Sequence, residues 1–265
     1  MTQNEGAAIN KILAAQPWDV SRHRVSLLGI PHAGSGVSSL YALQQMSPPW
    51  VRTGIVRFTG RETRFLDGVV SDANTYLEEI ARSAAALRGP GPLFLLGNCS
   101  GASLMLAAQR AIEDLGTSVA GFVAVSAPAP VAPAPVLPPG MTDTQFVDWL
   151  KTSWRIPPAL FEDADMLDLL LPQLRADCEV LTALPSERTN TGRPFLVVFG
   201  ENDENLGSPE LRQWRDWGEE VTGATVPGGH FVAVERPESV WQAVSSFIEG
   251  VTATGGPAGT PTSAT

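Results

Sequence analysis

A glycine-flanked cysteine lies between two apolar segments of this chain, in the stretch LLGNCSGA at residues 95–102. The five central residues, Gly-Asn-Cys-Ser-Gly, have the Gly-x-nucleophile-x-Gly spacing of a nucleophile elbow, which usually presents a serine. Cys99 at the centre predicts covalent catalysis, in which a thiolate attacks a carbonyl carbon and holds the acyl group. The helix that follows such a turn favours an anion at its N-terminus, and Ser100 is predicted to offer its backbone N–H to the oxyanion.

Two other interpretations of this stretch stay open. Ser100 carries a hydroxyl and is a rival nucleophile, although the spacing favours Cys99. Cys99 also fits a structural role, because cysteine is a common small apolar residue at buried strand ends.

A nucleophile of this kind needs a base and an acid, and in this arrangement they follow it in the order acid, then histidine. His230 follows a candidate last strand and a Gly-Gly turn, so it is the predicted base. The acid is expected after the apolar segment 195–200, where Glu201, Asp203 and Glu204 are the candidates. We favour Asp203, because a few loop residues are needed to aim a carboxylate back at the imidazole.

The loop IPHAGSG at residues 30–36 follows the first apolar strand and is rich in small residues. Small residues let the backbone approach a substrate closely, and Ala33 is therefore the predicted second oxyanion donor. His32 is expected to shape this loop, and neither His32 nor His23 has the chain position of the base. An ordinary turn is the alternative for the whole stretch.

Apolar, β-rich segments must position these loops, and they alternate with helical patterns. Nearly continuous apolar strands are typical of a parallel sheet that is buried on both faces. The alternation predicts an α/β fold with a mostly parallel, doubly wound sheet. The strands are expected at 25–30, 54–58, 92–97, 122–127 and 195–200, with helices at 73–89 and 102–116 that end at glycine.

A proline-rich segment at residues 128–140 interrupts this alternation, since it forms neither a helix nor a central strand. The next segment, 142–154, opens with the capping-box pair Thr142 and Gln145 and has apolar residues at mostly helical spacing. This pattern predicts a helix outside the β/α repeat.

A second amphipathic segment at residues 163–184 contains Pro172, where we expect the helix to bend or break. Together the two segments predict an inserted helical lid at about residues 141–185. Helices packed directly on the sheet are the alternative.

Length and composition favour one globular domain at residues 25–250. Residues 1–24 are expected to form a peripheral N-terminal arm, and residues 251–265 a disordered tail. The net charge of −10 argues against nucleic acid or an anionic membrane as a partner. No apolar segment approaches the roughly 20 residues that span a bilayer, and the N-terminus lacks a secretory pattern, so a cytoplasmic location is expected.

The chain has two cysteines, Cys99 and Cys178. Two are too few for a disulfide framework, and they lack the spacing of metal ligands. We therefore expect free thiols, no metal and no cofactor.

Several motifs in unbroken order make the chain resemble the type II, stand-alone thioesterases of polyketide and nonribosomal peptide biosynthesis. They are PHAGSG, TGRETRF, LLPQLRADCEVL, FGENDE and PGGHF, within residues 25–249. The resemblance implies an α/β-hydrolase that removes acyl groups from the phosphopantetheine arm of acyl or peptidyl carrier proteins. It implies triad roles for Cys99, Asp203 and His230, and oxyanion roles for Ala33 and Ser100.

The resemblance also implies that the lid helices line a chamber for a small-molecule acyl substrate, although their apolar faces fit the core of the lid equally well. The residues predicted to bind substrate are His32, Trp149, Trp154, Leu170, Leu174 and Phe231.

The elbow departs from the family pattern, because the usual His-Ser-Met is replaced by Asn98, Cys99 and Ser100. A cysteine exchanges one thioester for another, so the acyl group on the enzyme stays activated. Hydrolysis is the first predicted outcome, and transfer to a non-water nucleophile, as in an acyltransferase or cyclase, is the alternative. A catalytically silent carrier-binding protein is a third interpretation.

Three arginines near TGRETRF, Arg57, Arg61 and Arg64, are candidates for contact with an acidic carrier protein or the phosphate of its arm. Solvated loop charges are the alternative.

Overall fold

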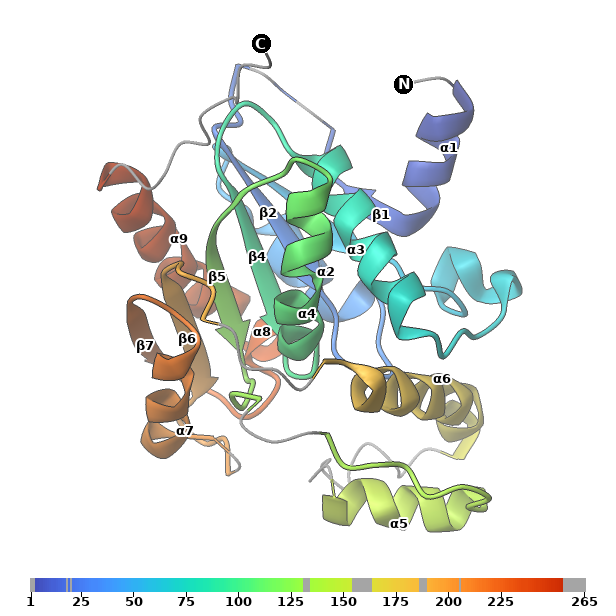
Figure 1. Ribbon diagram of the computed structural model, residues 1–265. Coiled ribbons are helices and arrows are strands. Elements are labelled where there is room, and N and C mark those ends of the chain that lie inside the picture. The colour runs from blue at the N-terminus through green and yellow to red at the C-terminus, as the bar shows by residue number, and fades with distance from the viewer. Residues whose placement is uncertain are drawn as a thin grey trace.

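A mostly parallel sheet forms the centre of the computed structural model, which describes residues 3–17, 19, 21–130, 134–153, 164–185, 190–204 and 206–254 (Figure 1). Within this part of the chain the sheet has seven strands in the order β1-β3-β2-β4-β5-β6-β7, and only β1 runs antiparallel to its neighbour. The strands are β1 (Leu13–Ala15), β2 (Val25–Ile30), β3 (Val51–Val56), β4 (Leu93–Asn98), β5 (Val119–Val125), β6 (Phe195–Gly200) and β7 (Val221–Val226).

Helices cover both faces of this sheet. The described helices are α1 (Gln3–Ile12), α2 (Ser38–Gln45), α3 (Ala73–Leu87), α4 (Gly101–Asp114), α5 (Asp143–Ser153), α6 (Ala164–Ala183), α7 (Ser208–Gln213), α8 (Val232–Glu235) and α9 (Pro237–Ala253), with 3-10 turns η1 (Glu62–Asp67) and η3 (Trp214–Asp216). The predicted doubly wound α/β fold is confirmed.

Two large hydrophobic clusters lie on opposite faces of the sheet. Ile80 of α3 and Met105 of α4 belong to one cluster, and Leu40 of α2 and Val244 of α9 belong to the other. Successive residues of each central strand supply the two clusters in turn, because strand side chains alternate between faces. This explains why β2, β4 and β6 consist of buried residues throughout.

The predicted strands at 25–30 and 195–200 agree with β2 and β6 to the residue. The predicted strand at 54–58 is displaced, because β3 begins at Val51, which pairs with Val25 of β2. Apolar content alone does not fix where a strand starts.

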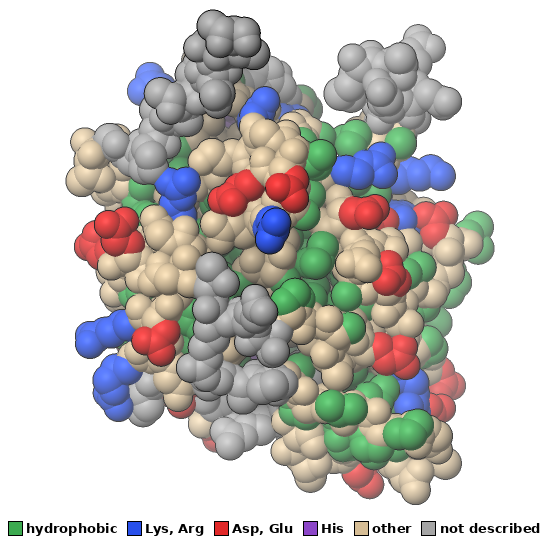
Figure 2. All heavy atoms as spheres, in the orientation of Figure 1, with side chains coloured by type: hydrophobic (Ala, Val, Ile, Leu, Met, Phe, Trp, Pro, Cys, Tyr) green, Lys and Arg blue, Asp and Glu red, His purple; other side chains and the backbone are tan. Residues whose placement is uncertain are grey.

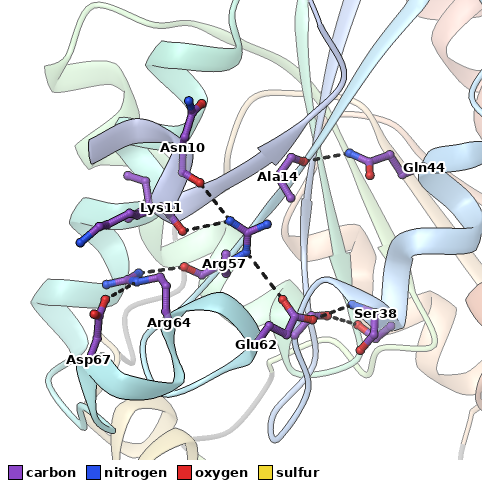
Figure 3. Close-up of polar contacts among 12 residues, drawn as sticks. Asn10, Lys11, Ala14, Ser38, Gln44, Arg57, Glu62, Arg64 and Asp67 are labelled. Atoms are coloured by element: carbon purple, nitrogen blue, oxygen red, sulfur yellow. Dashed lines mark hydrogen bonds and ion pairs between the residues drawn. The ribbon is translucent and has the colours of Figure 1, made fainter. Parts of the chain in front are cut away.

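The N-terminal arm predicted at residues 1–24 is not wholly peripheral. Leu13–Ala15 adds an antiparallel edge strand to β3, with Leu13 opposite Val56. Leu13 is buried in the sheet core, and the Arg57 guanidinium donates hydrogen bonds to carbonyl oxygens at the end of α1 (Figure 3). A three-residue strand gives too short an alternation to detect in a sequence.

Helices α5 and α6 are inserted between β5 and β6, and Figure 1 shows them beyond the carboxyl ends of the central strands. The capping box at the start of α5 is confirmed. The Thr142 N–H donates to Gln145 Oε1 over 3.0 Å, and the Gln145 N–H donates to Thr142 Oγ1 over 3.3 Å.

The sequence predicts a bend or a break at Pro172, and the break is wrong, because α6 runs without interruption from Ala164 to Ala183. An internal proline costs a helix about 3 kcal/mol. Packing on both sides of Pro172 offsets this cost, since Leu171 before it packs in a hydrophobic cluster with α5 and Val180 after it packs in the sheet core.

The C-terminal helix α9 continues to Ala253, so residues 251–253 of the predicted tail are helical. Residues 255–265 of that predicted tail lie outside the described residues. None of the helices in the described ranges combines the length and apolar character of a membrane span.

Candidate functional site

Cys99 occupies a sharp turn between β4 and α4. Its backbone has a φ of +50°, a conformation that non-glycine residues rarely adopt and that is typical of strained functional turns. The Cys99 N–H donates to the carbonyl of Val125 on the neighbouring strand over 2.8 Å, and the Cys99 carbonyl accepts from the Ala102 N–H over 3.0 Å. These bonds hold the partly exposed cysteine at the carboxyl end of the sheet.

The two glycines around Cys99 are required by close backbone contacts. A Cβ on Gly97 would lie 2.4 Å from the Cα of Ala102, and a Cβ on Gly101 would lie 2.4 Å from the carbonyl oxygen of Ile30. Backbone atoms on both sides cannot easily shift, so the spacing seen in the sequence has a steric cause.

His230 lies in contact with both Asp203 and Cys99. Its Nδ1 is 2.8 Å from Asp203 Oδ2, and its side chain also shares a hydrogen bond with Cys99. The Asp203 side chain is fully buried, whereas Glu201 and Glu204 are exposed. Of the three acids named from the sequence, Asp203 is therefore the one that contacts the imidazole.

The surroundings of His230 favour its protonated form. Burial alone lowers the pKa of His230, but the hydrogen bonds to Asp203 and Cys99 and the negative charges of these groups raise it to about 10. An imidazolium beside a thiol favours the nucleophilic thiolate. The three residues thus have the contacts of a cysteine-histidine-aspartate triad.

We expect His230 to be the one imidazole of the three histidines that stays protonated at pH 8. Burial lowers the pKa of His23 and of His32, so both are neutral there. Nitrogen chemical shifts of the imidazoles, followed by NMR from pH 5 to pH 11, measure this. Because a raised pKa keeps the proton bound until the pH passes it, the His230 signal should change near pH 10.

The Cys99→Ala variant is the control for that titration. Removing the sulfur removes a hydrogen bond and a negative charge, so the His230 midpoint should move to lower pH. A wild-type midpoint close to the ordinary histidine value of about 6.5 would contradict the triad contacts.

The loop after β2 brings Ala33 and Ser100 together. The Ala33 N–H donates to Ser100 Oγ over 2.8 Å, and the Gly34 N–H donates to Asp177 Oδ2 over 2.6 Å. His32 Nδ1 lies 3.0 Å from the Ala33 carbonyl oxygen, which is consistent with a neutral ring that donates from Nδ1. The amide predicted to bind an oxyanion is thus bonded to the Ser100 hydroxyl.

Asp177 of α6 organises a buried polar cluster that our sequence reasoning missed. It forms an ion pair with Arg61 and accepts a hydrogen bond from the Tyr76 hydroxyl over 2.7 Å. Arg61 also donates to the Tyr76 hydroxyl over 3.3 Å. With the Gly34 N–H, these side chains form what we call the Asp177 network, which ties α6 to the loop after β2. The two charged partners lie in motifs that the sequence shows, Arg61 in TGRETRF and Asp177 in LLPQLRADCEVL.

The three arginines near η1 are held by internal partners. Arg57 Nε lies 3.7 Å from Glu62 Oε2, and Arg64 Nη1 lies 2.8 Å from Glu79 Oε1. Figure 3 shows Arg57 between α1 and Glu62, with Arg64 beside Asp67. Arg57, Arg61 and Arg64 have side-chain exposures of 17%, 4% and 9%, so the alternative of solvated loop charges is wrong, and little of each side chain is exposed for contact with a carrier protein.

The inserted helices share a third hydrophobic cluster. Phe146 and Leu150 of α5 are fully buried in it, and Trp149 stacks on Phe146. Leu174 of α6 lies against the loop after β2, because a Cβ on Gly34 would be 2.6 Å from Leu174 Cδ2. Many of the apolar residues predicted to line an acyl chamber therefore pack in the core between α5 and α6.

The predicted substrate-binding residues are divided between two places. His32 and Phe231 lie beside the triad, with ring centroids 6.0 Å apart, and the Phe231 ring is 5.3 Å from that of His230. Leu170 and Trp149 are only partly buried at the edge of the third cluster. Trp154 lies outside the described residues. Figure 2 shows hydrophobic side chains gathered over α5 and α6.

Comparisons with known proteins identify the family of this chain. A family model described as a thioesterase domain matches residues 26–248. AngT of Vibrio anguillarum, a probable anguibactin biosynthesis thioesterase, is 24% identical over 230 residues, which is 84% of this chain and 91% of AngT. The gramicidin S biosynthesis protein GrsT of Aneurinibacillus migulanus is 26% identical over 223 residues, covering 81% of this chain and 85% of GrsT.

Solved structures share the fold. YbtT, a type II thioesterase from the yersiniabactin pathway, superposes with a TM-score of 0.73 at 21% identity, over 91% of this chain and 99% of YbtT. At this identity the similarity concerns the fold, and it matches the predicted α/β-hydrolase architecture.

Proposed function

The chain belongs to the thioesterase family, and from this premise we propose that it releases acyl groups from carrier-protein thioesters through a covalent intermediate on Cys99. The observation that carries the proposal is the contact of His230 with both Cys99 and the buried Asp203 at the nucleophile elbow. The carrier-protein substrate, in polyketide or nonribosomal peptide biosynthesis, is supported by the names of AngT, GrsT and YbtT.

In the proposed first step, the Cys99 thiolate attacks the thioester carbonyl carbon and a tetrahedral oxyanion forms. When this intermediate collapses, the bond to the pantetheine sulfur breaks and His230 gives its proton to the leaving thiolate. The acyl group is then bound to Cys99. Asp203 orients the imidazole in both steps and stabilises its positive charge whenever His230 is protonated.

In the proposed second step, the now neutral His230 takes a proton from water as the water attacks the acyl group on Cys99. Collapse of the second tetrahedral intermediate breaks the bond to Cys99 and releases the acid. Helices α5 and α6 act in this proposal as a lid over the acyl chain, with Leu170, Leu174 and Trp149 as contacts on one side. His32 and Phe231 would contact the acyl group near the sulfur.

Transfer to an acceptor other than water is the second candidate, and the identity of the nucleophile favours it. A thioester on Cys99 is close in energy to the thioester that enters, so an amine, an alcohol or another thiol can react with it. A serine enzyme would pass through a more stable oxygen ester. Cys99, His230 and Asp203 would have the same roles in hydrolysis and in transfer.

Mass spectrometry of the intact protein tests the proposal. Wild-type protein is mixed with an acylated carrier protein, quenched in acid within seconds and digested to locate the added mass. We expect the acyl mass on the peptide that contains Cys99, and not on the one with Cys178, which is buried and whose pKa burial raises to about 12.

The released products, analysed with and without added amines or alcohols, separate the candidates. Free acid alone supports hydrolysis, and a conjugate that carries the acceptor supports transfer. Absence of both the acyl-enzyme and any product would contradict the proposal and leave a carrier-binding protein without catalysis.

A further inference from the structure

Two consecutive amides of the loop after β2 have acceptors within the protein. The Ala33 N–H donates to Ser100 Oγ over 2.8 Å, and the Gly34 N–H donates to Asp177 Oδ2 over 2.6 Å. The Gly34 amide is held by the buried Asp177 network, in which Asp177 also binds Arg61 and Tyr76. A substrate oxyanion therefore meets this loop with both of its amides engaged.

The Ser100 hydroxyl is the acceptor of the Ala33 N–H, so it occupies the position in front of that amide. A serine hydroxyl has one proton to donate and two lone pairs that accept. One lone pair receives the Ala33 N–H, and in the described part of the chain the hydroxyl proton has no protein acceptor. Ser100 and Ala33 line a small cavity of about 10 Å³, together with Tyr76 and Asp177 of the Asp177 network. Accepting a hydrogen bond polarises a hydroxyl and makes it a stronger donor.

Ser100 also follows Cys99 directly and stands at the start of α4, with φ −60° and ψ −22°. The first N–H groups of a helix have no acceptor within the helix, so the Ser100 amide is available to an anion there. The backbone and the side chain of the residue that follows Cys99 thus each have one proton without a protein acceptor in the described part of the chain.

We propose that the Ser100 hydroxyl, polarised by the Ala33 N–H, is the second hydrogen-bond donor to the oxyanion, beside the Ser100 N–H. As the Cys99 sulfur bonds to the carbonyl carbon, the π electron pair moves onto oxygen and both Ser100 protons bind it. When the carbonyl re-forms, the bond to the leaving sulfur breaks and the hydroxyl keeps its proton. The inference rests on the proposed role of Cys99, and it assigns the Ser100 side chain a catalytic function.

Two reactions of Cys99 separate this role from a structural one. Acylation by an acyl-N-acetylcysteamine thioester passes through an oxyanion, whereas alkylation by iodoacetamide needs the thiolate but forms no oxyanion. We expect Ser100→Ala to slow acylation by about 10²-fold, the usual effect of removing one oxyanion donor. The alkylation rate should stay within about twofold of wild type. Ser100→Thr keeps a hydroxyl and should acylate within about tenfold of wild type.

Each outcome has a defined meaning. If Ser100→Ala acylates as fast as wild type or faster, the Ala33 N–H binds the oxyanion directly, the hydroxyl only blocks it, and the inference is wrong. If alkylation slows as much as acylation, Ser100 acts by positioning Cys99, which also overturns it. Wild-type protein that is alkylated but never acylated at Cys99 would instead refute the proposed function.

Discussion

Cys99→Ala is expected to lower kcat/KM for acyl-thioester release by about 10⁴-fold or more. Loss of the sulfur removes the covalent intermediate, and water must then attack the thioester with help only from oxyanion binding and orientation. Release of acid from an acylated carrier protein, measured by chromatography, gives the rate. The effect should fall mainly on kcat, because the substrate contacts proposed for α5, α6 and the loop after β2 remain.

Cys178→Ala is the matched control for this variant. Cys178 is 1% exposed and packs in the third hydrophobic cluster, so its removal should leave kcat/KM within about twofold of wild type. Turnover that survives in Cys99→Ala and fails in Cys178→Ala would show that the nucleophile has been assigned to the wrong cysteine.

Asp177→Ala should lower the free energy of unfolding by about 3–5 kcal/mol, the usual cost of removing one partner of a buried ion pair. The change leaves the buried Arg61 guanidinium without its carboxylate and removes the acceptor of both the Tyr76 hydroxyl and the Gly34 N–H. Urea unfolding, followed by tryptophan fluorescence and by circular dichroism, measures the difference.

An exposed ion pair supplies the comparison for that variant. Asp148 lies 3.5 Å from Lys151 on α5, with 69% of its side chain exposed. Pairs of this kind contribute about 0–1 kcal/mol, so Asp148→Ala should leave the unfolding curve almost unchanged. Equal effects of Asp148→Ala and Asp177→Ala would mean that the Asp177 network does not hold α6 to the loop after β2.

The parts of the site that the sequence predicted are those with a local signature. The elbow has its two glycines, and His230 follows a Gly-Gly turn. Asp203 follows a continuous apolar strand in the expected chain order. The fold class was predictable for the same reason, because alternating apolar strands and glycine-terminated helices are local patterns.

Contacts between distant segments were not predictable in this way. Arg61 and Asp177 are 116 residues apart in the chain, and Ala33 and Ser100 are 67 apart. Each of these residues belongs to one of the motifs described above, but the sequence of one motif does not indicate which residue of another motif it contacts. The continuous helix through Pro172 has a similar cause, since packing on both sides outweighs the local preference.

The edge strand β1 determines how far the N-terminus can be shortened in a version of the protein made for expression. The family match begins at residue 26, whereas the sheet continues through Leu13–Ala15 on the far side of β3. A version that begins at residue 26 would lack β1, and the backbone N–H and C=O groups of β3 that pair with β1 would be unpaired. Unpaired strand edges can pair with other chains, so such a truncation favours aggregation even though it retains Cys99, Asp203 and His230.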